Sequence, residues 1–141
     1  MTDSGNRWEA VQRLVSETAE QSPFYRRQWT RVGHPTTPVS PADFAARFPF
    51  TTKADLVADQ AQHPPYGSIL TCPLTAYVRC HQTSGTTGSP LRWLDTAADW
   101  NALTDDWATV LRAAGVTSQD RVFAAFSFGP FLGFWLAFEA A

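Results

Sequence analysis

Charge is scarce in this chain, and neither sign is in marked excess. Charged residues make up 17% of the 141 residues, and the formal net charge is -2. Proteins that bind nucleic acid through its phosphates carry clustered lysines and arginines. Lys53 is the only lysine in the sequence. The composition therefore predicts a small molecule or a protein as partner, and no nucleic acid.

Cysteines and targeting signals are also few. Cys72 and Cys80 have no companion histidines or cysteines at zinc-binding spacing, so we expect two ordinary reduced thiols. The first thirty residues show no basic segment followed by an apolar run. The expected location is therefore the cytoplasm.

One long apolar run, from Val122 to Phe138, stands near the end of the sequence. It is shorter than the roughly 18 to 20 residues of a membrane helix, and Gly129 and Pro130 interrupt it. A membrane span is the disfavoured alternative. The run instead predicts a buried strand over 121–126, a turn over 127–130 and the start of a buried helix. A buried helix that stops so abruptly suggests a shortened chain.

The first half of the sequence has the patterns of helices. Apolar residues recur every three or four positions over 7–20, which is typical of an amphipathic helix. Ser22 and Pro23 predict the cap and first turn of a second helix that ends at Gly33. Two shorter helices are expected over 40–48 and 52–62, the latter capped by Thr51 or Thr52.

The second half has an α/β pattern. Residues 77–83 and 91–95 predict two strands of a hairpin, and 96–114 predict a helix that Gly115 ends. Between the strands lies TSGTTG, at 83–88. Its small and hydroxyl side chains suit a loop whose N–H groups surround phosphate oxygens, but the same residues also build ordinary hairpin turns. The lysine of a P-loop is missing.

Four segments in order carry a resemblance to a known family. They are SPFYRRQW near the start, FPFTTKADL at 48–56, YVRCHQTSGTTGSP at 77–90 and DRVFAAFSFGPFLG at 120–133. With these segments the sequence resembles the adenylate-forming (AMP-binding) enzymes, and within them the phenylacetate-CoA ligase-like branch. The resemblance implies an α/β fold: a helical lead-in over 1–75, followed over 76–141 by the first strands and helices of a truncated AMP-binding subdomain.

The resemblance also implies an activity and a set of ligands. A carboxylate substrate, aryl or otherwise apolar, would attack ATP to give an acyl-adenylate, and coenzyme A would then accept the acyl group, with magnesium assisting. The phosphate loop would consist of Thr83, Ser84, Gly85, Thr86, Thr87 and Gly88. The pocket for the acid would include Phe126, Phe128, Gly129 and Phe131.

Three features keep alternatives open. Many relatives have a lysine after the proline of the loop, where this chain has Leu91 and then Arg92. Phenylalanines in an apolar run are often core residues rather than pocket residues. His81, beside the loop, is either a ligand for a phosphate or carboxylate or simply a hydrogen-bonded polar residue.

Several parts of the expected enzyme are not found in this sequence. The resemblance implies that the catalytic lysine, the adenine contacts and the acidic residue for magnesium lie elsewhere, so the chain alone is expected to be incomplete and inactive. An alternative is a non-catalytic nucleotide-binding or protein-interaction module with the same fold. In either case a complementary C-terminal chain is a candidate partner.

Overall fold

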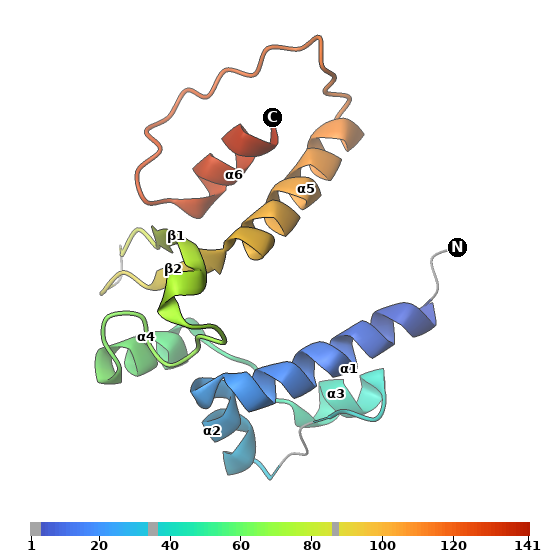
Figure 1. Cartoon of the computed structure of the whole chain (residues 1–141), viewed down its shortest axis with the longest axis vertical. Coiled ribbons are helices and arrows are strands. Elements are labelled where there is room, and N and C mark those ends of the chain that lie inside the picture. The colour runs from blue at the N-terminus through green and yellow to red at the C-terminus, as the bar shows by residue number, and fades with distance from the viewer. Residues whose placement is uncertain (1–3, 34–36, 86–87) are drawn as a thin grey trace. The chain divides into compact units, whose positions relative to one another are not determined.

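The computed structural model describes residues 4–33, 37–85 and 88–141, and it divides into two compact units, Met1–Cys72 and Pro73–Ala141. The first unit is helical (Figure 1). Its elements are α1 (Ser4–Gln21), α2 (Pro23–Arg31), α3 (Pro41–Arg47) and α4 (Lys53–Gln62). The second unit contains a 3-10 turn (Leu74–Ala76), β1 (Tyr77–Gln82), β2 (Arg92–Thr96), α5 (Ala97–Ala113) and α6 (Leu132–Ala140). The mixed α/β class predicted from the sequence is confirmed.

Side-chain caps begin the helices of the first unit where the sequence places them. The Ser22 hydroxyl accepts a hydrogen bond from the Tyr25 N–H, and Pro23 occupies the first turn of α2. At α4, Thr52 accepts from the N–H of Asp55, and the Asp55 carboxylate accepts from the N–H of Thr52. These bonds satisfy N–H groups that a helix start leaves without partners. The predicted starts of α2 and α4 are therefore confirmed, whereas α2 ends at Arg31 rather than at Gly33.

The core of the first unit forms along one face of α1. Val15, Ala19 and Trp29 are buried together, and the Trp29 ring packs edge-on against Phe48 with centroids 5.2 Å apart. Val15 and Ala19 are four residues apart, so they share one helix face. This spacing is the pattern from which the first helix was predicted.

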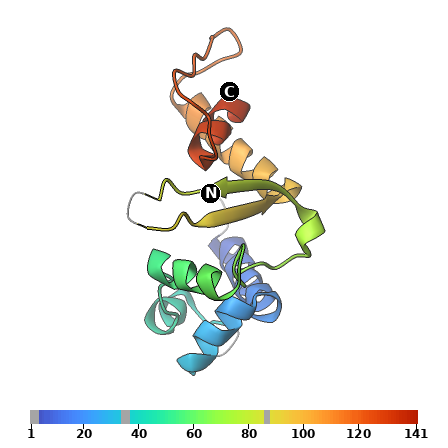
Figure 2. The same cartoon turned by 90° about the vertical axis from the view of Figure 1, so that its left-hand side faces the viewer.

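A β-hairpin is the centre of the second unit. β1 and β2 pair antiparallel with His81 opposite Trp93 and Gln82 opposite Arg92, which confirms the predicted hairpin. Thr96 then caps α5 through a reciprocal pair of bonds with Asp99. Figure 2 shows the hairpin, with residues 83–85 and 88–91 at the end where the two strands are connected.

Glu139 connects three elements of the second unit. Its carboxylate, on α6, accepts hydrogen bonds at 2.7 and 2.9 Å from Arg79 of β1. It also accepts a bond at 2.7 Å from the indole N–H of Trp100, on α5. The guanidinium of Arg79 lies 4.8 Å from the centre of the Trp100 ring. Charge-assisted bonds of this kind are stronger than neutral ones, so Glu139 fixes α6 to the hairpin and α5.

The predicted strand over 121–126 is wrong. These residues have no regular secondary structure and form part of the segment that arches from α5 to α6 (Figure 1). Val122 is 55% exposed and Phe123 is 89% exposed. A strand needs a neighbour for its N–H and C=O groups, and the described sheet consists of β1 and β2 alone. Apolar sequence without a pairing neighbour therefore remains irregular here.

The helix predicted after the turn does form, as α6, but it is only partly buried. Leu136 is buried at 2% exposure, whereas Phe134 and Phe138 are 37% and 53% exposed. Among the described residues, no helix has the length and apolar character needed to cross a membrane.

Candidate functional site

The loop between the strands is closed at its base by two hydrogen bonds. The N–H of Thr83 donates to the carbonyl of Leu91 at 3.0 Å. The N–H of Leu91 donates in return to the hydroxyl oxygen of Thr83 at 3.0 Å. Leu91 is buried, so this pair has a fixed place at the end of the hairpin. The loop therefore starts from a defined base, unlike a flexible linker.

Gly85 adopts a backbone conformation that suits glycine. Its φ is +66°, and an added Cβ would lie 3.0 Å from the Gly88 carbonyl oxygen and 3.1 Å from Pro90 Cγ. The N–H of Gly88 donates to the Gly85 carbonyl at 3.1 Å, which closes a tight turn. Left-handed backbone costs other residues roughly 1–2 kcal/mol. Of the predicted phosphate ligands, Thr86 and Thr87 lie outside the described residues.

The base of the loop meets the predicted acid-binding turn. The N–H of Gln82 donates to the Pro130 carbonyl at 2.9 Å. Gly129, with a φ of +49°, shapes this turn, and its carbonyl accepts a bond from the indole N–H of Trp135 at 2.9 Å. The structure therefore brings together two segments that the sequence assigns to one site.

The predicted pocket phenylalanines pack largely on one another and on α6. Phe126 stacks on Phe134 with ring centroids 4.4 Å apart. Phe128 packs against Trp135 at 4.6 Å, and Phe131 meets Phe134 edge-on at 5.9 Å. Such contacts are those of an aromatic cluster. The proposed contact of these residues with an acid stays a prediction.

A cavity of about 240 Å³ lies at the junction of the hairpin, the loop base and α6. Its lining consists of His81, Gln82, Thr83, Leu91, Trp93 and Leu132. The three predicted pocket phenylalanines are not among these residues. The lining is mainly apolar, with few groups able to bind an anion, a balance that is usual for small-molecule sites. His81 is the titratable member of the lining.

His81 and Asp95 form a buried pair on one face of the hairpin. The Nδ1 atom of His81 lies 3.4 Å from Oδ2 of Asp95, and the two side chains are 6% and 4% exposed. Burial raises the pKa of the Asp95 carboxyl, and the neighbouring His81 opposes that effect. Asp95 was not identified from the sequence, because an acidic residue near the end of a short strand gives no sign of burial.

The raised pKa of Asp95 predicts how the stability of the second unit depends on pH. Because the folded state favours the protonated acid, ionising Asp95 costs stability as pH rises from the unfolded pKa, about 3.9, through the higher folded pKa. Asp95→Asn cannot ionise, so its stability relative to the parent chain should increase over that window and then level off. Thermal unfolding at a series of pH values measures this difference. A stability advantage of Asp95→Asn over the parent chain that falls as pH rises would contradict this prediction.

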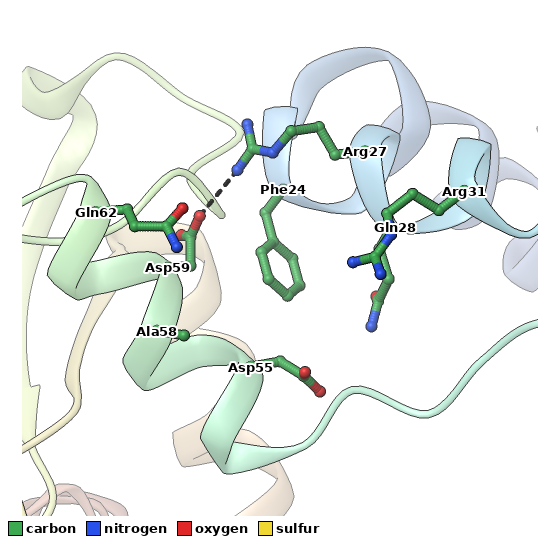
Figure 3. A pocket seen from close by; sticks show the side chains of 8 residues that line it. All are labelled: Phe24, Arg27, Gln28, Arg31, Asp55, Ala58, Asp59 and Gln62. Carbon is green, nitrogen blue, oxygen red and sulfur yellow. Dashed lines mark hydrogen bonds and ion pairs between the residues drawn. The ribbon is translucent and has the colours of Figure 1, made fainter.

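A second cavity, of about 260 Å³, lies in the first unit between α2 and α4. Figure 3 shows Arg27 and Arg31 of α2 on one side and Asp55 and Asp59 of α4 on the other. The charges of these two arginines and two aspartates cancel, so the lining of the groove has no net charge. The groove therefore offers no strong field for an anionic ligand.

Asp59 gives this groove a structural function. Its carboxylate accepts two bonds from Ser68, at 2.6 Å from the N–H and at 2.6 Å from the hydroxyl. It also accepts a bond from Arg27 at 2.9 Å. Gly67 lies so close that an added Cβ would be 2.6 Å from Oδ2 of Asp59. Asp59 therefore holds the segment that follows α4 against α2.

The chain is similar in sequence to known enzymes over most of its length. No family model matches the chain. The phenylacetate-coenzyme A ligase of Aromatoleum evansii is 37% identical over 124 residues, which is 84% of this chain and 26% of that enzyme. The enzyme of the same name from Escherichia coli (strain K12) is 35% identical over 123 residues, or 81% of this chain and 25% of the relative.

Solved structures agree with the sequence relatives. A 2-hydroxyisobutyryl-CoA ligase, solved in complex with 2-HIB-AMP and CoA, superposes with a TM-score of 0.86 at 33% identity. The match covers 96% of this chain and 30% of that ligase. The chain therefore has the fold of part of an adenylate-forming ligase. Within that class it is a homologue of the phenylacetate-coenzyme A ligases, as the sequence motifs predicted, and it spans about a quarter of their length.

Proposed function

We propose that this chain supplies the phosphate-binding loop and part of the acid-binding region of an AMP-forming carboxylate–CoA ligase. The observation that carries the proposal is the position of the loop base. Hydrogen bonds between Thr83 and Leu91 close this base, Gly85 follows with a positive φ, and the bond from Gln82 to Pro130 joins it to the turn before α6. Thr83, Ser84, Gly85 and Gly88, together with Thr86 and Thr87 outside the described residues, would bind the phosphates of ATP. Small residues leave room for a ligand to approach the backbone.

The proposed reaction has two steps. A carboxylate oxygen of the acid attacks the α-phosphorus of ATP, the bond to the β-phosphate oxygen breaks, and pyrophosphate leaves. The thiolate of coenzyme A then attacks the acyl carbon, the acyl C–O bond of the mixed anhydride breaks, and AMP leaves with that oxygen. The contribution of the loop is to bind and orient the phosphates, because positioning and charge stabilisation account for most of the catalysis of such transfers.

The acid proposed for this enzyme is aryl or otherwise apolar. The aromatic cluster around Phe126, Phe128 and Phe131, next to the turn at Gly129, supports that class. Magnesium assistance is part of the proposal, but the described residues hold no group of three His, Cys, Asp or Glu side chains suited to a metal ion. We therefore assign no residue of this chain to magnesium. A cytoplasmic location also remains a proposal.

A partner for the exposed apolar segment belongs to the same proposal. Residues 122–138 include Val122, Phe123 and Phe138, all more than half exposed. Contiguous exposed apolar surface is typical of interaction sites. We propose that the remaining length of a ligase, in one polypeptide or as a complementary C-terminal chain, covers it. The alternative of a non-catalytic interaction module rests on the same surface.

A chimera tests the proposal. Residues 4–141 replace the matching quarter of the E. coli phenylacetate-coenzyme A ligase, and exchange of labelled pyrophosphate into ATP is measured with phenylacetate and a panel of aryl acids. We expect acid-dependent exchange from the chimera and none from the 141-residue chain alone. A folded chimera that binds ATP but exchanges no pyrophosphate with any acid would contradict the ligase function and favour the non-catalytic module.

A further inference from the structure

His81 lies where the proposed phosphate loop and acid-binding turn meet. It is on β1, two residues before Thr83, and it lines the 240 Å³ cavity together with Thr83 and Leu132. Its ring stacks on Trp100 with centroids 5.0 Å apart and planes 15° apart. Stacking and burial fix the position of the ring. His81 is therefore held rigidly in the wall of a cavity.

Asp95 occupies one edge of that ring. The register places Asp95 opposite Arg79, yet Arg79 binds Glu139 of α6 instead. Asp99, the acidic residue at the start of α5, is engaged in the cap at Thr96. At 3.4 Å, His81 Nδ1 and Asp95 Oδ2 are within ion-pair distance, and neither has a hydrogen-bond partner among the described residues. Asp95 is thus the charged group that faces His81.

This arrangement has a chemical consequence for the cavity. Each ring nitrogen of histidine can carry a proton and donate a hydrogen bond. Asp95 lies at the Nδ1 edge and His81 lines the cavity, so we assign the contact with a ligand to the Nε2 edge. An imidazole N–H within a mainly apolar lining is an effective donor for an anionic oxygen.

We propose that His81, oriented by Asp95, binds an anionic oxygen of a ligand in the cavity between the loop base and α6. The inference rests on the proposed function, from which the ligand comes: the oxygen belongs either to a phosphate of ATP or to the carboxylate of the acid. His81 is the binding residue, and Asp95 is a positioning residue that acts through it. A histidine with a purely structural function would affect stability, but it would not change ligand affinity, and its ring resonances would not respond to a ligand.

Calorimetric titration of the 141-residue chain tests this inference, with ATP and phenylacetate as separate ligands at a series of pH values. His81→Asn keeps a nitrogen near the Nδ1 position but removes Nε2. Loss of a hydrogen bond to a charged group predicts a fall in affinity of about tenfold or more for one ligand.

Asp95→Asn tests the positioning function. If Asp95 orients the His81 ring, this variant should weaken binding of the same ligand and change the shifts that the ligand induces in the ring resonances of His81. His63→Asn is the matched control, because His63 lies in the first unit and its side chain is 47% exposed. It should leave both affinities and their pH dependence unchanged.

The outcomes separate the inference from the proposed function. A parent chain that binds ATP while His81→Asn binds both ligands equally well at every pH overturns the inference and leaves the proposed function standing. A parent chain that binds neither ligand overturns both. If His81→Asn does not fold, Asp95→Asn and an NMR titration of the His81 ring in the parent chain decide. Ring resonances that neither ligand moves would refute the inference.

Discussion

Replacing Gly85 by alanine is expected to lower the affinity of the chain for ATP by tenfold or more. The backbone at Gly85 has a φ of +66°, and the new methyl group would meet the Gly88 carbonyl oxygen at 3.0 Å and Pro90 at 3.1 Å. The strain of roughly 1–2 kcal/mol is relieved when the turn opens, which moves the N–H groups proposed to face the phosphates. A shift of about 1.4 kcal/mol already corresponds to tenfold in affinity. Calorimetric titration with ATP measures the effect.

Gly115→Ala is the matched control for this substitution. Gly115 also has a positive φ, +87°, but an added Cβ would meet nothing within 4 Å, and the residue follows α5, outside the loop. Its backbone strain should lower stability by a similar amount without weakening ATP binding. Equal ATP affinities for Gly85→Ala and the parent chain would show that the loop does not bind phosphate through this turn.

Replacing Asp59 by alanine should lower the free energy of unfolding of the first unit by about 2–4 kcal/mol. The substitution leaves the N–H and hydroxyl of the half-buried Ser68 without their acceptor, and each should cost about 1–2 kcal/mol, the lower part of the range for buried donors. The bond to Arg27 adds little, because the Arg27 side chain is 51% exposed and screened by solvent. Denaturant unfolding followed by the amide NMR signals of the first unit measures the loss.

Asp55→Ala serves as the comparison for Asp59→Ala. Asp55 lies on the same helix and caps it at Thr52, so its removal should cost about 1 kcal/mol, the usual value of a cap. If the two substitutions destabilised the unit equally, Asp59 would not be the residue that holds the segment after α4 in place.

Local signals explain what the sequence predicted well. Ser22, Thr52 and Thr96 bond to N–H groups three residues further along, so they set helix starts without help from distant residues. The hairpin is equally local, because its strands flank one short loop. The expectation of a turn at Gly85 between the strands likewise followed from residue types in a short window, although phosphate binding there stays a prediction.

Long-range requirements explain what the sequence did not predict. Residues 121–126 are apolar enough for a buried strand, but pairing depends on a neighbouring strand that the described sheet lacks. Asp59 and Asp95 are both buried acids, and neither differs in local sequence from an exposed acid. Their function comes from Ser68 and Arg27 in one unit and from His81 in the other, and these contacts form only on folding.

ATP binding to the 141-residue chain, measured by amide NMR shifts during a titration, tests most directly whether the loop is a phosphate site. We expect saturable shifts at the described loop residues Thr83, Ser84, Gly85 and Gly88 and at Gln82, with the groove between α2 and α4 unaffected. Shifts confined to Arg27, Arg31 and their neighbours, or no shifts at millimolar ATP, would contradict the claim that this loop is a phosphate site.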